Sequence, residues 1–184
     1  MTMLNVIGKR AAPADAVDLL LECHDRIRQF LALGRRVAEA RPDQLAEVPE
    51  AASRVRRYFT QALPLHAQDE EQSILPRLRG REAEVDAALA SMAHEHAEHE
   101  EPLGRLVAAC EAVAREPSRH AALAGAMGAA VGELERHFEI HLRREEEIIF
   151  PAMRRLLAGA LDAEIVREIR ARRGVAEASG QTPP

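Results

Sequence analysis

The 184-residue sequence predicts an all-α protein, an antiparallel four-helix bundle with a short extra helix at its C-terminal end. Three observations support this fold class. Hydrophobic residues make up 47% of the chain and are mostly Ala and Leu, whereas aromatic residues make up only 3%, a balance that favours helices. Apolar residues recur at intervals of three and four over four long stretches. Short loops join these stretches, which places consecutive helices antiparallel.

Composition also limits the function classes. The net charge is −5, so we expect no nucleic-acid partner. No apolar run approaches the roughly 20 residues of a membrane-spanning helix, so no membrane association is expected. Lys9 and Arg10 follow the short apolar run at the N-terminus, unlike in a signal peptide. Cys23 and Cys110 form no motif, and a reduced, cytoplasmic compartment is therefore expected.

The first helix is expected to begin near Pro13–Asp15, because Pro fits a first helical turn and Asp favours the N-terminal end. Arg41-Pro42-Asp43 should end it. His24 lies in the middle of its apolar stripe. A single histidine in such a stripe is usually a core residue bonded to a neighbour, so His24 alone indicates no function.

The second helix is expected from about Pro49 to about Arg79, and its apolar stripe includes His66 and Glu70. Pro64 lies within it and should kink the helix one turn before His66. The stripe therefore brings an imidazole and a carboxylate to the core side of this helix.

The third helix is expected at residues 82–115, with His96 on its apolar face. His94 precedes His96 by two residues, about 200° round the helix, and should face solvent. His99 and Glu100 follow His96 by three and four residues, so both lie near it on the helix surface.

The fourth helix should begin at Ser118, a good N-cap residue, and should end or kink at Pro151. His141 and Glu145 lie on its apolar stripe. His120 is expected at the exposed start of this helix, without a role.

Asp162 should cap a short fifth helix that ends at Arg173-Gly174. Its arginines suit the negative end of the helix dipole and are expected in solvent. The length of the chain is typical of one domain. We expect the bundle at residues 13–160, the short helix at residues 161–174, and flexible termini at residues 1–12 and 175–184.

One pattern occurs twice, once in the second helix and once in the fourth. In both copies a Glu follows a His by four residues, a second Glu follows at once, and a Pro ends the run at the same offset. The copies run from His66 through Glu70 and Glu71 to Pro76, and from His141 through Glu145 and Glu146 to Pro151. Residues i and i+4 share a helix face. Each copy therefore presents an imidazole and a carboxylate side by side.

Each long helix contributes one core histidine, and two helices add a carboxylate. These six residues are His24, His66, Glu70, His96, His141 and Glu145. A buried carboxylate without a partner costs several kcal/mol, and no Lys or obvious Arg falls beside Glu70 or Glu145 on the stripes. A pair of dications would resolve this, because bound metal ions favour the ionised form.

The donor types narrow the choice of metal. Imidazole and carboxylate without thiolate favour iron, manganese or zinc over copper(I) or an iron–sulfur cluster, and the two cysteines are poorly placed for a zinc site. The His-Glu-x-x-His motif of zinc proteases is absent. The Glu-x-x-His motif of ferritin-like di-iron bundles is absent too, because the order here is His-x-x-x-Glu.

The chain resembles the hemerythrin-like, His-His-Glu cation-binding family over about residues 15–157. The resemblance is carried by His24 in Glu-Cys-His-Asp, by Glu95-His96, and by the two His-x-x-x-Glu copies with their prolines. It implies a non-haem centre of two iron ions, bridged by two carboxylates and by an oxo or hydroxo group. Carried over to this chain, His24 and His66 would bind one iron, His96 and His141 would bind the other, and Glu70 and Glu145 would bridge them.

Two features depart from the oxygen-carrying hemerythrins. Those proteins have a second His one turn after the first on the third helix, where this chain has Glu100, and their last carboxylate follows its His by five residues instead of four. Whether His99, Glu100 or His137 joins the metal shell stays open, because Pro102 should bend the third helix and change its phase. The pattern is closer to bacterial proteins that repair iron–sulfur centres after oxidative or nitrosative stress. Those proteins carry an N-terminal cysteine-containing domain that this sequence lacks.

Three functions fit these features. The first, which we favour, is a di-iron protein that binds or senses oxygen, nitric oxide or peroxide, or handles iron under oxidative or nitrosative stress. The second is an enzyme that uses the same centre to consume peroxide or nitric oxide, or to repair iron–sulfur centres. The third is a helical interaction protein with a structural metal. A structural site should be coordinatively closed, whereas the ligand set here is incomplete, which favours the first two.

Overall fold

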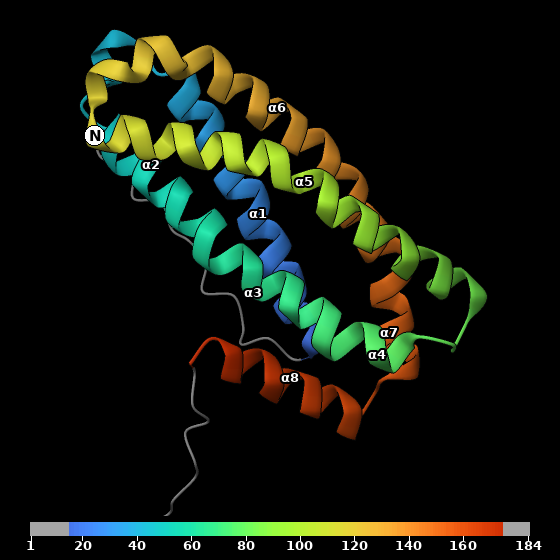
Figure 1. Cartoon of the computed structure of the whole chain (residues 1–184). Coiled ribbons are helices and arrows are strands. Elements are labelled where there is room, and N and C mark those ends of the chain that lie inside the picture. Colours follow the sequence, from blue (N-terminus) through green and yellow to red (C-terminus); the bar gives the residue numbers. More distant parts are fainter. Residues whose placement is uncertain (1–14, 175–184) are drawn as a thin grey trace, which may run out of the picture.

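The computed structural model describes residues 15–174, and every regular element in this range is helical (Figure 1). The bundle consists of α1 Ala16–Ala38, a second run of α2 Val48–Arg57, α3 Leu63–Gln68 and α4 Leu75–Leu78, then α5 Ala83–Arg115, and finally α6 His120–Arg144 with α7 Phe150–Leu156. Helix α8, Ala160–Arg172, follows. The predicted all-α four-helix bundle with a short extra C-terminal helix is confirmed. The termini expected to be flexible, residues 1–12 and 175–184, lie outside the described residues, and the domain limits stay a prediction.

A side-chain hydrogen bond caps the first run, whereas none caps the start of α6. Helix α1 begins after Asp15, whose carboxylate accepts the N–H of Asp18 at 2.8 Å. The predicted N-cap at Ser118 is wrong. Ser118 lies in the short 3-10 turn η4, Pro117–Arg119, and its hydroxyl donates to Glu116 Oε1 at 3.2 Å instead of capping α6.

Within residues 15–174, no helix combines the length and the apolar character that a membrane span requires.

Three π turns interrupt the second and fourth runs, and each ends two residues before a proline. They are η2 Tyr58–Ala62 before Pro64, η3 Asp69–Ile74 before Pro76, and η5 Glu145–Ile149 before Pro151. A proline has no N–H, and its ring clashes with the carbonyl four residues earlier in an α-helix. The wider π turn relieves this clash. The run therefore continues past each proline, and the distortion expected at Pro64 and Pro151 takes the form of a π turn.

A polar layer divides the apolar core into two clusters. The first cluster joins the second half of α1 to α2, α5 and α6, and includes Ile27 and Leu134. The second joins the first half of α1 to α4, α5, α7 and α8, and includes Leu20, Ile149 and Ile165. Each of these fully buried side chains contributes about 1.5–3 kcal/mol to folding. The predicted ligands lie between the two clusters along each helix.

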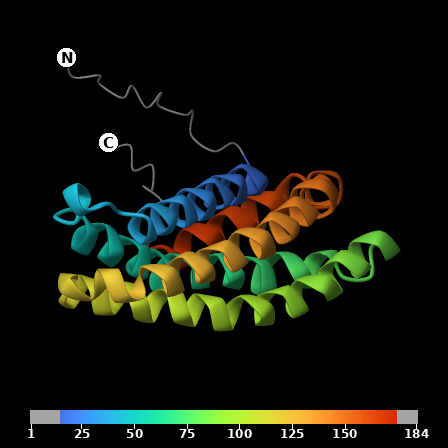
Figure 2. The same ribbon diagram turned by 90° about the horizontal axis from the view of Figure 1, so that it is seen from above.

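Helix α8 lies along α1 and η3 at the side of the bundle (Figures 1 and 2). Its N-cap is Gly159, at a φ of 74°, so the prediction that Asp162 caps this helix is wrong. Asp162 lies in the first turn and accepts the backbone N–H of Ala16 at 2.9 Å. It therefore caps the first helix of the bundle and not its own helix.

Two arginines at the C-terminal end of α8 bind the bundle. Arg172 Nη1 lies 2.8 Å from Oδ1 of Asp69, and Arg173 Nη2 lies 2.5 Å from Oδ2 of the same carboxylate. Arg172 also donates to Ser73 Oγ at 2.8 Å. The expectation that these arginines are solvated is wrong, because Asp69 is fully buried. The contacts fix α8 against η3, the turn that carries Glu70.

Candidate metal centre

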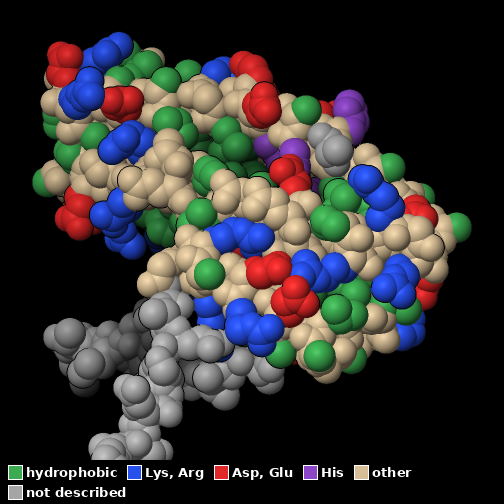
Figure 3. All heavy atoms as spheres, turned by 60° about the horizontal axis from the view of Figure 1, so that its bottom comes forward, with side chains coloured by type: hydrophobic (Ala, Val, Ile, Leu, Met, Phe, Trp, Pro, Cys, Tyr) green, Lys and Arg blue, Asp and Glu red, His purple; other side chains and the backbone are tan. Residues whose placement is uncertain are grey.

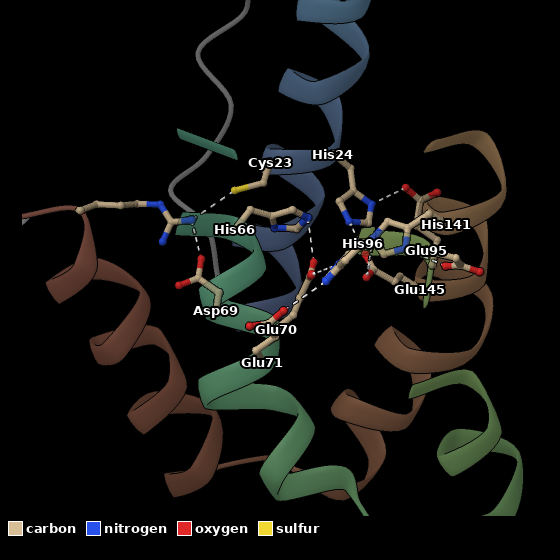
Figure 4. Close-up of polar contacts among 12 residues, drawn as sticks. Cys23, His24, His66, Asp69, Glu70, Glu71, Glu95, His96, His141 and Glu145 are labelled. Atoms are coloured by element: carbon tan, nitrogen blue, oxygen red, sulfur yellow. Dashed lines mark hydrogen bonds and ion pairs between the residues drawn. The ribbon is translucent and has the colours of Figure 1, made fainter. Parts of the chain in front are cut away.

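Four helical runs bring the six predicted ligands into the polar layer, where their side chains point toward one another (Figure 4). His24 comes from α1, His66 from α3, Glu70 from η3, His96 from α5, His141 from α6 and Glu145 from η5. Their donor atoms form two groups, each within 4.8 Å: His24, His66, Glu70 and Glu145, and then Glu70, His96 and His141. His96 is partly exposed, and the other five residues are at most 3% exposed.

Glu70 belongs to both groups. Its Oε1 lies 2.8 Å from Nε2 of His66, and its Oε2 lies 3.2 Å from Nε2 of His96. One carboxylate therefore turns one oxygen to a histidine of the first group and the other oxygen to a histidine of the second. A carboxylate in this position would be able to contribute one oxygen to a cation in each group.

Glu145 repeats this arrangement on the opposite helical run. Its Oε2 lies 2.8 Å from Nε2 of His24, and its Oε1 lies 3.3 Å from Nε2 of His141. The two copies of the His-x-x-x-Glu pattern thus place their carboxylates between the same two sets of histidines. Glu145 thus faces one histidine of each donor group, as Glu70 does.

Hydrogen bonds do not satisfy the atoms that face one another here. Both oxygens of Glu70 and of Glu145, and Nε2 of His24 and of His66, are buried without a hydrogen-bond partner among the described residues. Leaving such groups unpaired is strongly unfavourable, whereas coordination of a cation uses these lone pairs. The residues present therefore fit a metal site.

Charge in the metal-free centre is unevenly distributed. Burial and the Glu70 carboxylate raise the pKa of Glu145 to about 8. Burial also raises the pKa of Glu70, but the neighbouring His66 and His96 outweigh it and hold that pKa well below its ordinary value. Burial and His66 lower the pKa of His24 to about 4. At neutral pH the metal-free centre therefore retains a proton on Glu145 that a bound cation would displace.

A carboxylate outside the ligand set supports His24. Nδ1–H of His24 donates to Glu146 Oε1 at 2.7 Å, and Arg28 Nη2 donates to the same oxygen at 2.8 Å. Because an ionised carboxylate only accepts hydrogen bonds, Nδ1 carries the proton and Nε2 keeps its lone pair toward the centre. This contact therefore selects the tautomer that can bind a metal.

Two further histidines have the same support. Nδ1–H of His141 donates to Glu95 Oε2 at 2.8 Å, and Arg144 pairs with that carboxylate. Nδ1 of His96 lies 3.3 Å from Glu71 Oε1. The ligand pattern in the sequence predicted no role for these supporting carboxylates. The signal for them was the second Glu of each repeated run and the Glu that precedes His96.

His66 differs from the other three histidines. Its Nδ1 is buried and has no hydrogen-bond partner among the described residues. Cys23 lies beside this ring, with its sulfur accepting an N–H of Arg173 at 3.5 Å (Figure 4). The far side of His66 therefore faces a thiol and a guanidinium instead of a carboxylate.

His99 lies next to the second donor group but outside it. It is buried against Phe138, with ring centroids 4.1 Å apart, and its ring lies 5.3 Å from that of His141. Burial and His141 lower the pKa of His99 to about 3. Glu100 is exposed, and the His137 ring lies 5.9 Å from that of His99. Neither donor group contains His99, Glu100 or His137.

The two histidines that received no role behave differently. His94 is exposed over 78% of its side chain, as predicted. The prediction that His120 is exposed is wrong, because its Nε2 lies at hydrogen-bond distance, 2.6 Å, from the carbonyl oxygen of Val37 and the residue is buried. His120 thus ties the start of α6 to the end of α1.

The comparisons with known proteins agree with this site. A family model described as the hemerythrin HHE cation binding domain matches residues 15–125. The matched range includes His24, His66, Glu70 and His96, and the second copy of the repeated run lies beyond it. No curated protein matches the chain. Because the family model covers more than half of the residues, the chain belongs to the hemerythrin HHE cation-binding domain family.

Proposed function

We propose that the chain is a non-haem di-iron protein that binds or senses a small ligand such as oxygen, nitric oxide or peroxide. The family supports cation binding, and the buried His/Glu cluster supplies the donors. The observation that carries the proposal is the division of Glu70 and Glu145 between two sets of histidines. Imidazole and carboxylate donors suit iron, which when bound supplies redox chemistry and exchangeable coordination positions.

The second donor group is the more open one. The first group contains four residues, all buried, whereas the second contains three, and 20% of the His96 side chain is exposed. Figure 3 shows histidine side chains in a hollow of the surface, beside an acidic side chain. With Glu145 counted as well, whose Oε1 lies 3.3 Å from Nε2 of His141, a six-coordinate ion on this side would have about two positions that these four residues do not fill. We infer that a small ligand reaches the centre from the His96 side.

The number of unfilled coordination positions also distinguishes this proposal from the two alternative functions. A structural metal needs a closed shell, and neither donor group closes a six-coordinate one, which disfavours an interaction protein with a structural metal. An enzyme that consumes peroxide or nitric oxide would use the same residues, so turnover separates it from a binding protein. The cytoplasmic location expected from the sequence stays a prediction.

Metal analysis and ligand titration test the proposal together. Protein purified without oxygen from iron-supplied cells should contain two iron ions per chain. Persistent zinc alone, or less than one transition metal per chain, would contradict the di-iron proposal. Nitric oxide added to reduced protein, and azide added to oxidised protein, should give saturable optical changes. An iron-loaded protein that responds to neither would favour the structural metal, and steady-state turnover of peroxide or nitric oxide would favour the enzyme.

A further inference from the structure

A pocket of about 450 Å³ opens between α1, the η2–α3 segment and the residue that follows α8. Its lining includes Cys23, Arg26, Tyr58, Leu65, His66 and Arg173. No carboxylate side chain of the described residues lines it. The pocket lies on the far side of His66, away from the donor atoms that face the metal centre.

Positive charge is in excess around this pocket. Arg26 is exposed at the rim, and no carboxylate within residues 15–174 pairs with it. Arg173 shares the single carboxylate of Asp69 with Arg172. Among the described residues, Arg172 and Arg173 thus share one carboxylate and Arg26 has none, in a chain that carries 30 acidic and 25 basic residues.

A second pocket among the described residues differs from this one in its charge. A pocket of about 630 Å³ at the end of α1 is also lined by two arginines, Arg36 and Arg54. Glu39, Glu47 and Glu50 line it as well. Acidic and basic groups are mixed there, whereas the pocket beside His66 contains only the basic ones.

The remaining lining defines the kind of anion. A guanidinium binds a carboxylate through two parallel N–H donors, and the Tyr58 hydroxyl and the Gln61 amide add further donors. Ala62 and Leu65 form an apolar wall. The floor holds His66, only 3% exposed and with Nδ1 unpartnered among the described residues.

We propose that this pocket binds a small organic carboxylate of a few carbon atoms. The carboxylate lies between Arg26 and Arg173, and the apolar body lies against Ala62 and Leu65. His66 lines the pocket and is also a predicted metal ligand, but its Nε2 faces Glu70 at 2.8 Å, so the pocket is formed in the metal-free chain.

Cys23 provides a chemical reporter inside the pocket. Iodoacetate and iodoacetamide both alkylate a thiol by the same displacement, in which the sulfur bonds to carbon and iodide leaves, but only iodoacetate carries a carboxylate. In the metal-free full chain, we expect the rate ratio of iodoacetate to iodoacetamide at Cys23 to exceed that of N-acetylcysteine by about fivefold. Peptide mass spectrometry measures the ratio. Cys23 is 9% exposed, whereas Cys110 is fully buried, so labelling of Cys110 would report unfolding.

Two variants with substitutions in α1 test whether the positive charge of Arg26 raises the rate ratio. Arg26→Gln should return the ratio to that of N-acetylcysteine, and Arg36→Gln, an exposed arginine of the other pocket, should leave it high. A wild-type ratio equal to that of N-acetylcysteine, or one that survives Arg26→Gln, would overturn the proposal. Because no metal is present, this failure would leave the di-iron proposal untouched.

Binding of butyrate tests the same site without any reaction at the thiol. Saturation-transfer NMR should detect butyrate bound to the wild type and to Arg36→Gln, but not to Arg26→Gln. Butyramide, the neutral analogue, should give no signal. The carboxylate assignment would be overturned by equal signals from all three proteins, or by equal signals from butyrate and butyramide. It would also be overturned if the pocket bound inorganic phosphate but not butyrate.

Discussion

Glu146 accepts a hydrogen bond from Nδ1 of His24 at 2.7 Å, although 122 positions separate the two residues. Glu146 follows Glu145 directly, and Glu145 faces Nε2 of the same histidine at 2.8 Å. Two consecutive residues of η5 therefore face the two nitrogens of one imidazole, and Glu146 alone accepts a hydrogen bond from it. Support of this kind fixes the orientation of a ligating histidine and raises its basicity.

Replacing Glu146 should weaken metal binding without removing a ligand. Glu146→Gln keeps the size of the side chain but loses the charge that orients His24, so we expect the dissociation constant of the metal to rise about 10–100-fold. A competition titration with a chromophoric chelator measures this. Glu147→Gln, an exposed neighbour on the same turn, is the matched control. Equal constants in the two variants would show that the contact has no such role.

Glu70→Ala and Glu145→Ala should each lower the iron content from two per chain to one or less. Each carboxylate faces histidines of both groups, so its loss removes a donor from both ions. Elemental analysis of the purified variants decides the matter. His94→Ala is the control, because its side chain is 78% exposed and should leave the iron content unchanged. A similar loss in this control would contradict the phase of α5.

The metal-free protein should lose stability between pH 6.5 and 8. Burial and Glu70 hold the pKa of folded Glu145 at about 8, against 4.5 ordinarily, so the folded state binds the extra proton and its stability falls as pH rises through this window. His24, with its pKa lowered from 6.5 to about 4 by burial and His66, acts in the opposite sense only below 6.5. The fall should be on the order of 1 kcal/mol.

Urea unfolding at the two pH values in the presence of a chelator measures this fall. Glu145→Gln, which cannot ionise, should reduce it. An unchanged pH dependence in that variant would mean that Glu145 does not carry the proton.

Removing the metal should destabilise the fold but leave most of the helix. A ligand that binds only the folded state adds about 2.7 kcal/mol at 100 times its dissociation constant, and this contribution disappears on chelation. The two apolar clusters on either side of the polar layer remain buried in the metal-free protein. Circular dichroism should show a lower melting temperature with a largely preserved helical spectrum. Complete loss of that spectrum would mean that the metal holds the bundle together.

His120→Ala should lower stability without changing the iron content. The substitution leaves the carbonyl of Val37 without its bond from His120, which typically costs about 1–3 kcal/mol. Urea unfolding and elemental analysis on the same preparation separate the two effects. Ser118→Ala, two residues away on the exposed turn, should change neither quantity by much. A stability as high as that of the wild type would indicate that the His120 contact contributes little.

Helical periodicity was sufficient to bring the six ligands to one layer, because the phase of a helix is set locally. The π turn η3 begins at Asp69, one residue before Glu70, yet His66 and Glu70 stayed on one face, with Nε2 and Oε1 2.8 Å apart. The same reasoning gave the correct orientation of His94. Local pattern thus predicts which face of a helix carries a residue.

Contacts between distant segments could not be predicted in this way. The partner of Glu146 or of Asp69 depends on how helices pack against each other, and many arginines and carboxylates in the chain compete for these places. His120 was misjudged because it lies near a helix start, where the sequence does not show that the end of α1 covers it. Asp162 was misjudged for a similar reason, since a cap on its own helix and a cap on α1 use the same residue type.

The bond between Asp162 and Ala16 also bears on the order in which the protein can fold in the cell. A ribosome makes the chain from its N-terminus, so α1 emerges long before the residue that completes its first turn, 146 positions later. Contacts of such long separation form slowly. Helix α8, which leaves the ribosome after all four runs of the bundle, therefore completes the first of them.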